Sequence, residues 1–291
     1  MVEQLFEKDF WSNAFAEGGS IAALFEDGTG KKEPYDLEAS RKMWDEHAIG
    51  FARKIRRSRY IAQLLEYLQL APGTTVLDAG SGSGTLAIPL AQGGCEVHAL
   101  DFSFGMLQEL RYAAEAAGVA IPTYQRAWQE PWDDIPVCDV AITSRSFITD
   151  DLADGIAKLE SHARTRCVAT HIFKNPPWVD KGLLEALGRE IKPEPPYRLL
   201  AFINYLFALG RMPRISYITY QSEWDGRTRE SLVEDLRREV RPEGAAEEAA
   251  FEAFTERSIS YNDELGCWSC TAGKMTSWAI VDWDVPQNDL T

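Results

Sequence analysis

Short apolar runs alternate with helical patterns along the chain from about residue 60. Five runs of strand length stand out, at residues 74–79, 95–101, 121–127, 138–144 and 166–173. The segments 103–118 and 150–163 between them carry apolar residues at i, i+3 and i+4, the pattern of an amphipathic helix. Alternating strands and helices form right-handed βαβ units, which build a mostly parallel sheet with helices on both faces. The pattern therefore predicts a doubly wound α/β fold.

The segments on either side of this alternation have a different pattern. The N-terminal part is rich in aromatic and charged residues, and prolines at 173–178 and 192–197 bound an apolar helical piece. Strand-like runs return near the C-terminus, around an acidic helical stretch at residues 228–257. We therefore expect four segments: a helical N-terminal cap (1–58), an α/β core (59–173), an inserted helical cap (174–215) and the C-terminal part of the core (216–291).

Composition limits the kinds of partner that this chain can have. Its 291 residues are 45% hydrophobic and 26% charged, with 30 basic against 45 acidic residues and a formal net charge of −15. A field of that sign repels a phosphate backbone, so we expect no nucleic-acid partner. The longest nearly apolar stretch, residues 199–210, is too short to span a bilayer, and the acidic N-terminus lacks the apolar region of a signal peptide. We therefore expect no membrane partner, and five cysteines without framework spacing favour a cytoplasmic protein.

The first connection between a strand and a helix holds three alternating glycines. Residues 76–84 read VLDAGSGSG, with Gly80, Gly82 and Gly84 directly after an apolar run. Glycine has no Cβ and reaches positive φ without strain, so this loop can lie bare against a ligand at the carboxyl edge of the sheet. Dinucleotide-binding enzymes use G-x-G-x-x-G here, whereas this chain has G-x-G-x-G preceded by Asp78. A carboxylate at that position repels a pyrophosphate and suits a ligand with an ammonium group.

The loop D-A-G-S-G-S-G resembles the signature loop of the class I S-adenosylmethionine-dependent methyltransferases. A second mark of that family follows in VHALDFSFGML, where Asp101 ends the second strand and begins the pattern D-x-S-x-x-M-L. The resemblance spans residues 60–173 and implies a Rossmann-like fold with a seven-stranded sheet, in which Asp101 accepts hydrogen bonds from the ribose hydroxyls. It implies S-adenosylmethionine as the cofactor and S-adenosylhomocysteine as its product. The cofactor site that it implies contains these residues: Asp78, Gly80, Ser81, Gly82, Gly84, Asp101, Phe102, Met106, Ala127, Trp128 and Ser144.

The third strand departs from the family pattern at its end. Many members have an aspartate there that accepts the adenine amino group, but in QRAWQEPW the position falls on Ala127 or Trp128. The Trp128 ring either stacks on the adenine, with backbone groups or Gln129 reading its edge, or packs beneath the loop. After the fourth strand, TSRSF places Ser144 and Arg145 where family members face both the methionine moiety and the substrate.

Methyl transfer from a sulfonium needs little from a protein beyond positioning. The methyl group is already electrophilic, so we expect direct in-line displacement by a small-molecule acceptor. A general base is required only where the acceptor must lose a proton, and the catalytic candidates are His171 and Arg145, with a hydrogen-bonded structural role as the alternative for His171. Aromatic residues gather in the two caps and favour a flat or apolar substrate. The expected substrate pocket contains His47, Trp44, Arg145 and Tyr205.

Two other functions agree with parts of the sequence. An NAD(P)-dependent oxidoreductase shares the fold but not the glycine spacing, and a non-catalytic module that binds S-adenosylmethionine would keep the loop without turnover. Cys267 and Cys270 form C-W-S-C, half of a tetrahedral zinc site, but no second pair with matching spacing accompanies them, so no metal is expected. The acceptor atom, the use of a base and the oligomeric state stay open at this point. The leading hypothesis is a small-molecule methyltransferase.

Overall fold

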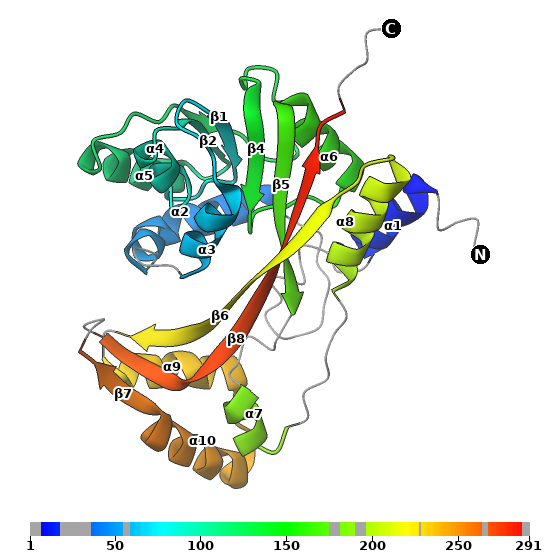
Figure 1. Cartoon of the computed structure of the whole chain (residues 1–291). Coiled ribbons are helices and arrows are strands. Elements are labelled where there is room, and N and C mark those ends of the chain that lie inside the picture. Colours follow the sequence, from blue (N-terminus) through cyan, green and yellow to red (C-terminus); the bar gives the residue numbers. More distant parts are fainter. Residues whose placement is uncertain are drawn as a thin grey trace, which may run out of the picture. The chain divides into compact units, whose positions relative to one another are not determined.

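The computed structural model describes residues 7–17, 36–54, 59–174, 181–189, 196–226, 228–263 and 267–286 (Figure 1). The chain forms two compact units. Among the described residues, unit 1 contains those up to Ile172, those from Tyr197 to Ile218 and those from Ala279 onward. Unit 2 contains the described parts of Phe173–Pro196 and Thr219–Trp278.

The central sheet has the strand order β3-β2-β1-β4-β5-β8-β6. Pairing is parallel between β1 and β2, β1 and β4, β2 and β3, and β4 and β5, whereas β8 runs opposite to β5 (Figure 1). The strand order reverses between β1 and β4, which is where doubly wound sheets bind ligands at the carboxyl ends of the strands. The strands are β1 (Thr75–Ala79), β2 (Glu96–Asp101), β3 (Thr123–Gln125), β4 (Cys138–Ser144), β5 (Ala163–Lys174), β6 (Arg214–Gly226) and β8 (Cys267–Asp284).

Seven helices of the described chain belong to unit 1 and bury apolar faces within it. In α3, Tyr60, Ile61, Leu64 and Leu68 are buried at helical spacing. Helix α2 packs against α5, and α1 packs against α8. Their bounds are α1 (Lys8–Glu17), α2 (Leu37–Lys54), α3 (Arg59–Leu68), α4 (Ala87–Gln92), α5 (Phe104–Ala116), α6 (Leu152–Ser161) and α8 (Tyr197–Ala208). None of the helices in the described ranges is long and apolar enough to cross a membrane.

A buried carboxylate on β8 joins several elements of unit 1. Asp282 accepts two hydrogen bonds from Arg166 on β5, at 3.0 and 2.6 Å, and one from Arg214 on β6 at 2.8 Å. The hydroxyl of Tyr67 on α3 donates to the same carboxylate at 2.9 Å. Burial raises the pKa of Asp282, but these hydrogen bonds outweigh it and lower the pKa below its ordinary value. The last strand is therefore tied to its neighbours by charge as well as by packing.

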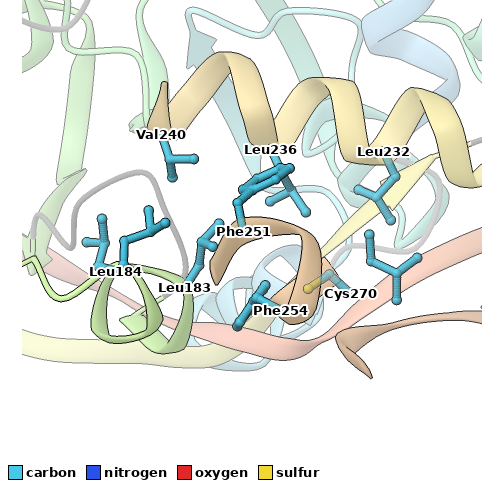
Figure 2. Packing of buried hydrophobic residues seen from close by; sticks show 10 residues of the cluster. Leu183, Leu184, Leu232, Leu236, Val240, Phe251, Phe254 and Cys270 are labelled. Carbon is cyan, nitrogen blue, oxygen red and sulfur yellow. The ribbon is translucent and has the colours of Figure 1, made fainter. Parts of the chain in front are cut away.

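Unit 2 has a hydrophobic core of its own (Figure 2). Leu232, Leu236 and Val240 lie on one face of α9 and point toward Phe251 and Phe254 of α10 (Figure 2). The same cluster contains Leu183, Leu184, Leu187, Ile259 and Cys270. Its elements are α7 (Lys181–Ala186), α9 (Arg229–Val240), α10 (Gly244–Ser258) and β7 (Ile259–Asn262), which pairs antiparallel with β8.

The doubly wound, mostly parallel sheet is confirmed, and three details differ from the prediction. Strand β7 pairs with β8 off the seven-strand path and makes the sheet eight-stranded. The helical stretch predicted at 228–257 is two helices, because Arg241 adopts a left-handed φ of 45° and Pro242 cannot continue α9. The two units divide the chain at other places than the four expected segments do: Tyr197–Ile218 belongs to unit 1, and the described part of Thr219–Trp278 belongs to unit 2.

Candidate active site

Only one of the three glycines in the loop after β1 faces open space. All three have positive φ, of 80° at Gly80, 52° at Gly82 and 85° at Gly84. A Cβ on Gly80 would collide with the side chain of Ser146, and one on Gly84 would lie 2.8 Å from Cγ of Leu110. A Cβ on Gly82 would meet nothing within 4 Å. Packing within the protein accounts for Gly80 and Gly84, whereas the bare face of Gly82 leaves room for a ligand.

The carboxylate of Asp101 ties this loop to the end of β2. Its Oδ2 accepts a hydrogen bond from the N–H of Gly82 at 2.8 Å, and its Oδ1 accepts one from the N–H of Ser103 at 2.9 Å. Burial raises the pKa of Asp101 to about 6, although the two backbone hydrogen bonds oppose the shift. Each carboxylate oxygen has two lone pairs, so Asp101 keeps the capacity to accept further hydrogen bonds from a ligand.

Asp78, at the end of β1, is buried without a hydrogen-bond donor of normal geometry. Within the described chain, neither of its oxygens has a hydrogen-bond partner, and the hydroxyl of Ser81 has none either. Burial, together with the carboxylate of Asp101, raises the pKa of Asp78 to about 7, against the opposing effect of the Ala87 amide. A buried carboxylate without donors is costly. The two acids therefore form a site that gains stability from a cationic, donor-bearing ligand.

Helix α2 is fastened to the start of α5. Ser103 is the N-cap of α5, and its hydroxyl donates to Oδ1 of Asp45 on α2 at 2.6 Å. The N–H of Gly105 donates to the same oxygen at 2.8 Å. A Cβ on Gly105 would lie 2.9 Å from Cα of Asp45, so this close contact between the helices requires glycine.

The other site residues expected on α2 and α5 differ in exposure. Phe102 is half-buried where the chain enters α5, and Met106 is buried in its first turn. On α2, Trp44 is half-buried, whereas His47 is exposed. The Nδ1–H of His47 donates to the carbonyl of Met43 one turn earlier, at 2.7 Å. Its described hydrogen bond therefore stays within its own helix.

The loop after β3 is held by side chains on both sides. Oε2 of Glu130 accepts a hydrogen bond from the N–H of Ala127 at 2.6 Å, and the indole N–H of Trp132 donates to the Ala127 carbonyl at 2.9 Å. The Trp128 ring is 5% exposed and its centroid lies 4.9 Å from those of both Trp132 and Phe147. These contacts favour packing of Trp128 beneath the loop over stacking on an adenine.

A polar cluster with one strained residue lies at the end of β4. The hydroxyl of Tyr60 is hydrogen-bonded to Ser144 at 2.9 Å and to Thr170 at 2.8 Å. Arg145 has a left-handed φ of 59°, a conformation that costs a non-glycine residue about 1–3 kcal/mol. Its N–H donates to Thr170 at 2.9 Å, and its guanidinium carbon lies 4.3 Å from the centroid of the Tyr60 ring. The hydroxyl of the following residue, Ser146, donates to the Ala79 carbonyl at the end of β1 at 2.9 Å. These two hydrogen bonds stabilise the strained conformation of Arg145.

His171, on β5, is packed among aromatic rings. Its ring centroid lies 4.3 Å from that of Phe202 and 5.8 Å from that of Phe147, and its Nε2 is buried without a hydrogen-bond partner in the described chain. Burial, together with the positive charge of Arg198 on α8, lowers the pKa of His171 to about 3. An imidazole with this pKa is neutral at pH 7 and a weak base, which favours a structural role. Tyr205, also on α8, is buried.

The C-W-S-C motif lies on β8 in unit 2. Residues three apart on a strand point to opposite faces, so Cys267 and Cys270 do not face a common ligand. Cys270 lies in the hydrophobic core, and Cys267 is half-buried. In the ranges that the structure describes, no three His, Cys, Asp or Glu side chains are grouped so that they could hold a metal ion.

Several residues that shape the site are absent from the sequence-based prediction: Arg41, Asp45, Tyr60 and Glu130. Arg41 and Asp45 lie on a cap helix whose placement against the core is not readable from its own pattern. Glu130 did have a signal, because it is the acidic residue nearest to Ala127 in QRAWQEPW.

Comparisons with known proteins identify the class. Residues 76–165 match the family model described as a methyltransferase domain, and residues 31–100 match that of protein-L-isoaspartate(D-aspartate) O-methyltransferase. An uncharacterized protein of Haemophilus influenzae is 32% identical over 246 residues, which cover 83% of this chain and 88% of that protein. The demethylmenaquinone methyltransferase of Renibacterium salmoninarum is 36% identical over 88 residues, 30% of this chain and 32% of that enzyme.

Solved structures of low identity accompany these relatives. The YcgJ protein of Bacillus subtilis is 12% identical with a TM-score of 0.48, over 79% of this chain and 99% of that one. A methyltransferase of Thiobacillus denitrificans, in complex with S-adenosylhomocysteine, is 18% identical with a TM-score of 0.45, over 79% and 92% of the two chains.

The sheet order, the glycine loop and the matched domain together define a Rossmann-like methyltransferase. The chain belongs to the class I S-adenosylmethionine-dependent methyltransferase family. The oxidoreductase and the non-catalytic module are not favoured.

Proposed function

We propose that this enzyme transfers the methyl group of S-adenosylmethionine to a small-molecule acceptor by direct in-line displacement. The observation that carries the proposal is the buried carboxylate of Asp78, whose oxygens have no hydrogen bond of normal geometry in the described chain, together with the open face of Gly82 in the loop that follows it. When bound, the cofactor supplies a sulfonium methyl group that is already electrophilic. An ammonium group at Asp78 would supply the missing donors and lower the pKa of that carboxyl.

The remaining cofactor contacts follow from the strand ends. Asp101 would accept hydrogen bonds from the ribose hydroxyls, and Ser81 would contribute its unpaired hydroxyl. Gly82 would let the cofactor lie against the backbone, and Phe102 and Met106 would line the ribose side at the start of α5. The loop that contains Ala127 would bound the adenine through its backbone, because the Trp128 ring is already packed.

We place the acceptor near Arg145 and the aromatic caps. The strained backbone of Arg145 holds its guanidinium over the Tyr60 ring, next to Ser144 at the same strand end. Trp44 and Tyr205 would supply apolar surface, which suits a small molecule and excludes water from the sulfonium. Neutral, buried His171 would shape this side of the pocket rather than remove a proton. The net charge of −15 supports a small molecule over a nucleic acid as the acceptor.

Calorimetric titration tests the cofactor assignment with a matched pair of glycine variants. Gly82 and Gly118 both have positive φ and open space where a Cβ would be, so valine strains both backbones alike. Gly82→Val should lose S-adenosylhomocysteine binding, because its side chain fills the ligand's space. Gly118→Val, at the end of α5, should bind as the wild type does. Unchanged affinity in folded Gly82→Val would refute this site, and binding of NADH in place of S-adenosylmethionine would refute the cofactor.

A further inference from the structure

The contacts of α2 with the cofactor loops carry one further inference, which rests on the proposed function. We infer that Arg41 and Glu130 are positioning residues for the adenosine half of the cofactor, so that helix α2 helps to set the geometry of the cofactor site. Arg41 lies on α2 and Glu130 in the loop after β3. Their ion pair joins the N-terminal cap to the loop that lacks the family's adenine-binding aspartate.

Arg41 reaches two separate loops of the core at once. Its Nε donates to the carbonyl of Phe102, after β2, at 3.2 Å. Its Nη2 donates to Oε1 of Glu130, after β3, at 2.6 Å, and its Nη1 donates to Glu38 on α2 itself at 2.7 Å. The planar fork of a guanidinium makes these three contacts simultaneously, which the single ammonium of lysine cannot do. One side chain therefore fixes the spacing between the ribose loop and the adenine loop.

Glu130 connects Arg41 to the backbone of the loop after β3. While Oε1 binds Arg41, Oε2 accepts the N–H of Ala127 at 2.6 Å. Burial raises the pKa of Glu130, but the hydrogen bonds from Arg41 and Ala127 outweigh it and lower the pKa below its ordinary value. The carboxylate is therefore charged and bridges a helix and a loop. The position of the Ala127 backbone depends on Arg41 through this bridge.

This ion pair differs from an ordinary surface salt bridge. The side chains of Arg41 and Glu130 are 19% and 32% exposed, and both make further hydrogen bonds that hold them in place. An exposed pair such as Arg164 and Asp139, at the amino ends of the strands, is 55% and 39% exposed at a separation of 3.4 Å. Exposed pairs contribute little, because water screens them and holding the side chains costs entropy. The partly buried pair is the one expected to control geometry.

A second set of hydrogen bonds joins α2 to the start of α5. Asp45, one turn further along α2, accepts hydrogen bonds from Ser103 and Gly105 at the start of α5. Asp101, two residues before Ser103, is the acid proposed to bind the ribose. Helix α2 is thus anchored beside the ribose site by Asp45, and Arg41 extends the anchorage to the adenine loop. Removal of Arg41 alone should loosen the adenine loop and leave α2 in place.

The test measures binding of S-adenosylhomocysteine by calorimetry, and of adenosine by competition, for Arg41→Met, Glu130→Gln and the double variant. Each single variant should raise the dissociation constant of S-adenosylhomocysteine about tenfold, the scale of one lost charge-assisted hydrogen bond. The affinity of the double variant for S-adenosylhomocysteine should be no lower than that of the single variant with the lower affinity, because the two residues act as a unit. Adenosine should lose affinity by the same factor. Arg41→Lys should restore only part of the affinity.

Arg164→Met is the matched control, and it should bind both ligands within twofold of the wild type. The denaturation midpoint of each variant in urea separates lost binding from lost folding. Three results would each overturn the inference. The effects of the two substitutions could be additive in the double variant, or the Arg41 and Glu130 variants could bind as tightly as Arg164→Met. The third result is a loss of affinity for S-adenosylhomocysteine without a loss for adenosine. A wild-type protein that binds neither S-adenosylmethionine nor S-adenosylhomocysteine would instead overturn the proposed function. The two failures are therefore distinguishable.

Discussion

Replacement of Asp78 by asparagine should stabilise the protein without cofactor and weaken cofactor binding. Asp78 is 1% exposed, and neither of its oxygens has a hydrogen-bond partner in the described chain. Its ionised form therefore loses the solvation that it has in the unfolded chain. Asparagine has the same shape and no charge, so it removes this cost. The residue thus favours ligand binding at the expense of folding.

The magnitude and the pH range follow from the pKa. Burial, with the charge of Asp101, raises the pKa of Asp78 from 3.8 to about 7. Between about pH 4 and 7 the folded chain keeps a proton that the unfolded chain has lost, so the stability of the wild type falls as the pH rises through this window. A shift of about 3 units at about 1.4 kcal/mol per unit gives about 4 kcal/mol at most. Because Asp101 titrates in the same range, we expect a gain of about 2–4 kcal/mol for Asp78→Asn above pH 7.

Urea denaturation of both proteins at pH 4.5 and pH 8 measures this difference. The free energies of unfolding should be close at pH 4.5, where the buried carboxyl is protonated, and should diverge at pH 8. Calorimetry at pH 8 should show weaker binding of S-adenosylmethionine to Asp78→Asn. An equal difference at both pH values, or a less stable variant at pH 8, would refute the electrostatic reasoning. Wild-type affinity in the variant would refute the role of Asp78 in binding.

Two further predictions concern the ends of β2 and β3. Asp101→Ala should weaken S-adenosylhomocysteine binding by about 1.5–3 kcal/mol, the scale of hydrogen bonds to a charged group; a ribose-deoxygenated analogue should lose less affinity for this variant than for the wild type, and equal losses would show that Asp101 does not accept from the ribose. Trp128→Phe removes the hydrogen bond from the indole to Ser146 and should lower the free energy of unfolding by about 1 kcal/mol in urea denaturation, with cofactor affinity within threefold; a tenfold loss of affinity at unchanged stability would instead support stacking of Trp128 on the adenine.

The sequence predicted best where a local pattern and a backbone requirement coincide. The apolar run before Gly80 and the acid at the end of β2 each depend on neighbours within a few residues, and each lies where it was expected. The sequence could not separate the roles of the three glycines. Two of them are decided by Ser146, which follows β4, and by Leu110 on α5, and both lie far from the loop in the sequence. Glycine spacing alone therefore does not show which of the three glycines has open space where a side chain would be.

The sequence left the outcome open, or gave no signal, where distant packing decides it. Trp128 was equally suited to two environments, and the neighbouring rings Trp132 and Phe147 favour one. The apolar residues of the stretch 228–257 indicated a helix but not its partner, and the structure buries them in unit 2 with α7. Arg41 and Glu130 are 89 positions apart, so neither indicates the other in the sequence.

The way in which the chain passes between its units determines how it can be dissected. The chain enters unit 2 after Ile172 and returns to unit 1 after Pro196. It enters unit 2 again after Ile218 and returns after Trp278, so the last described strand residues belong to unit 1. A C-terminal truncation that removed unit 2 would also delete Asp282, and it would leave Arg166 without its buried carboxylate. Internal excision is the route that spares unit 1. Since β6 and β8 are neighbours in the sheet and run in opposite directions (Figure 1), a short hairpin turn can replace the chain between them.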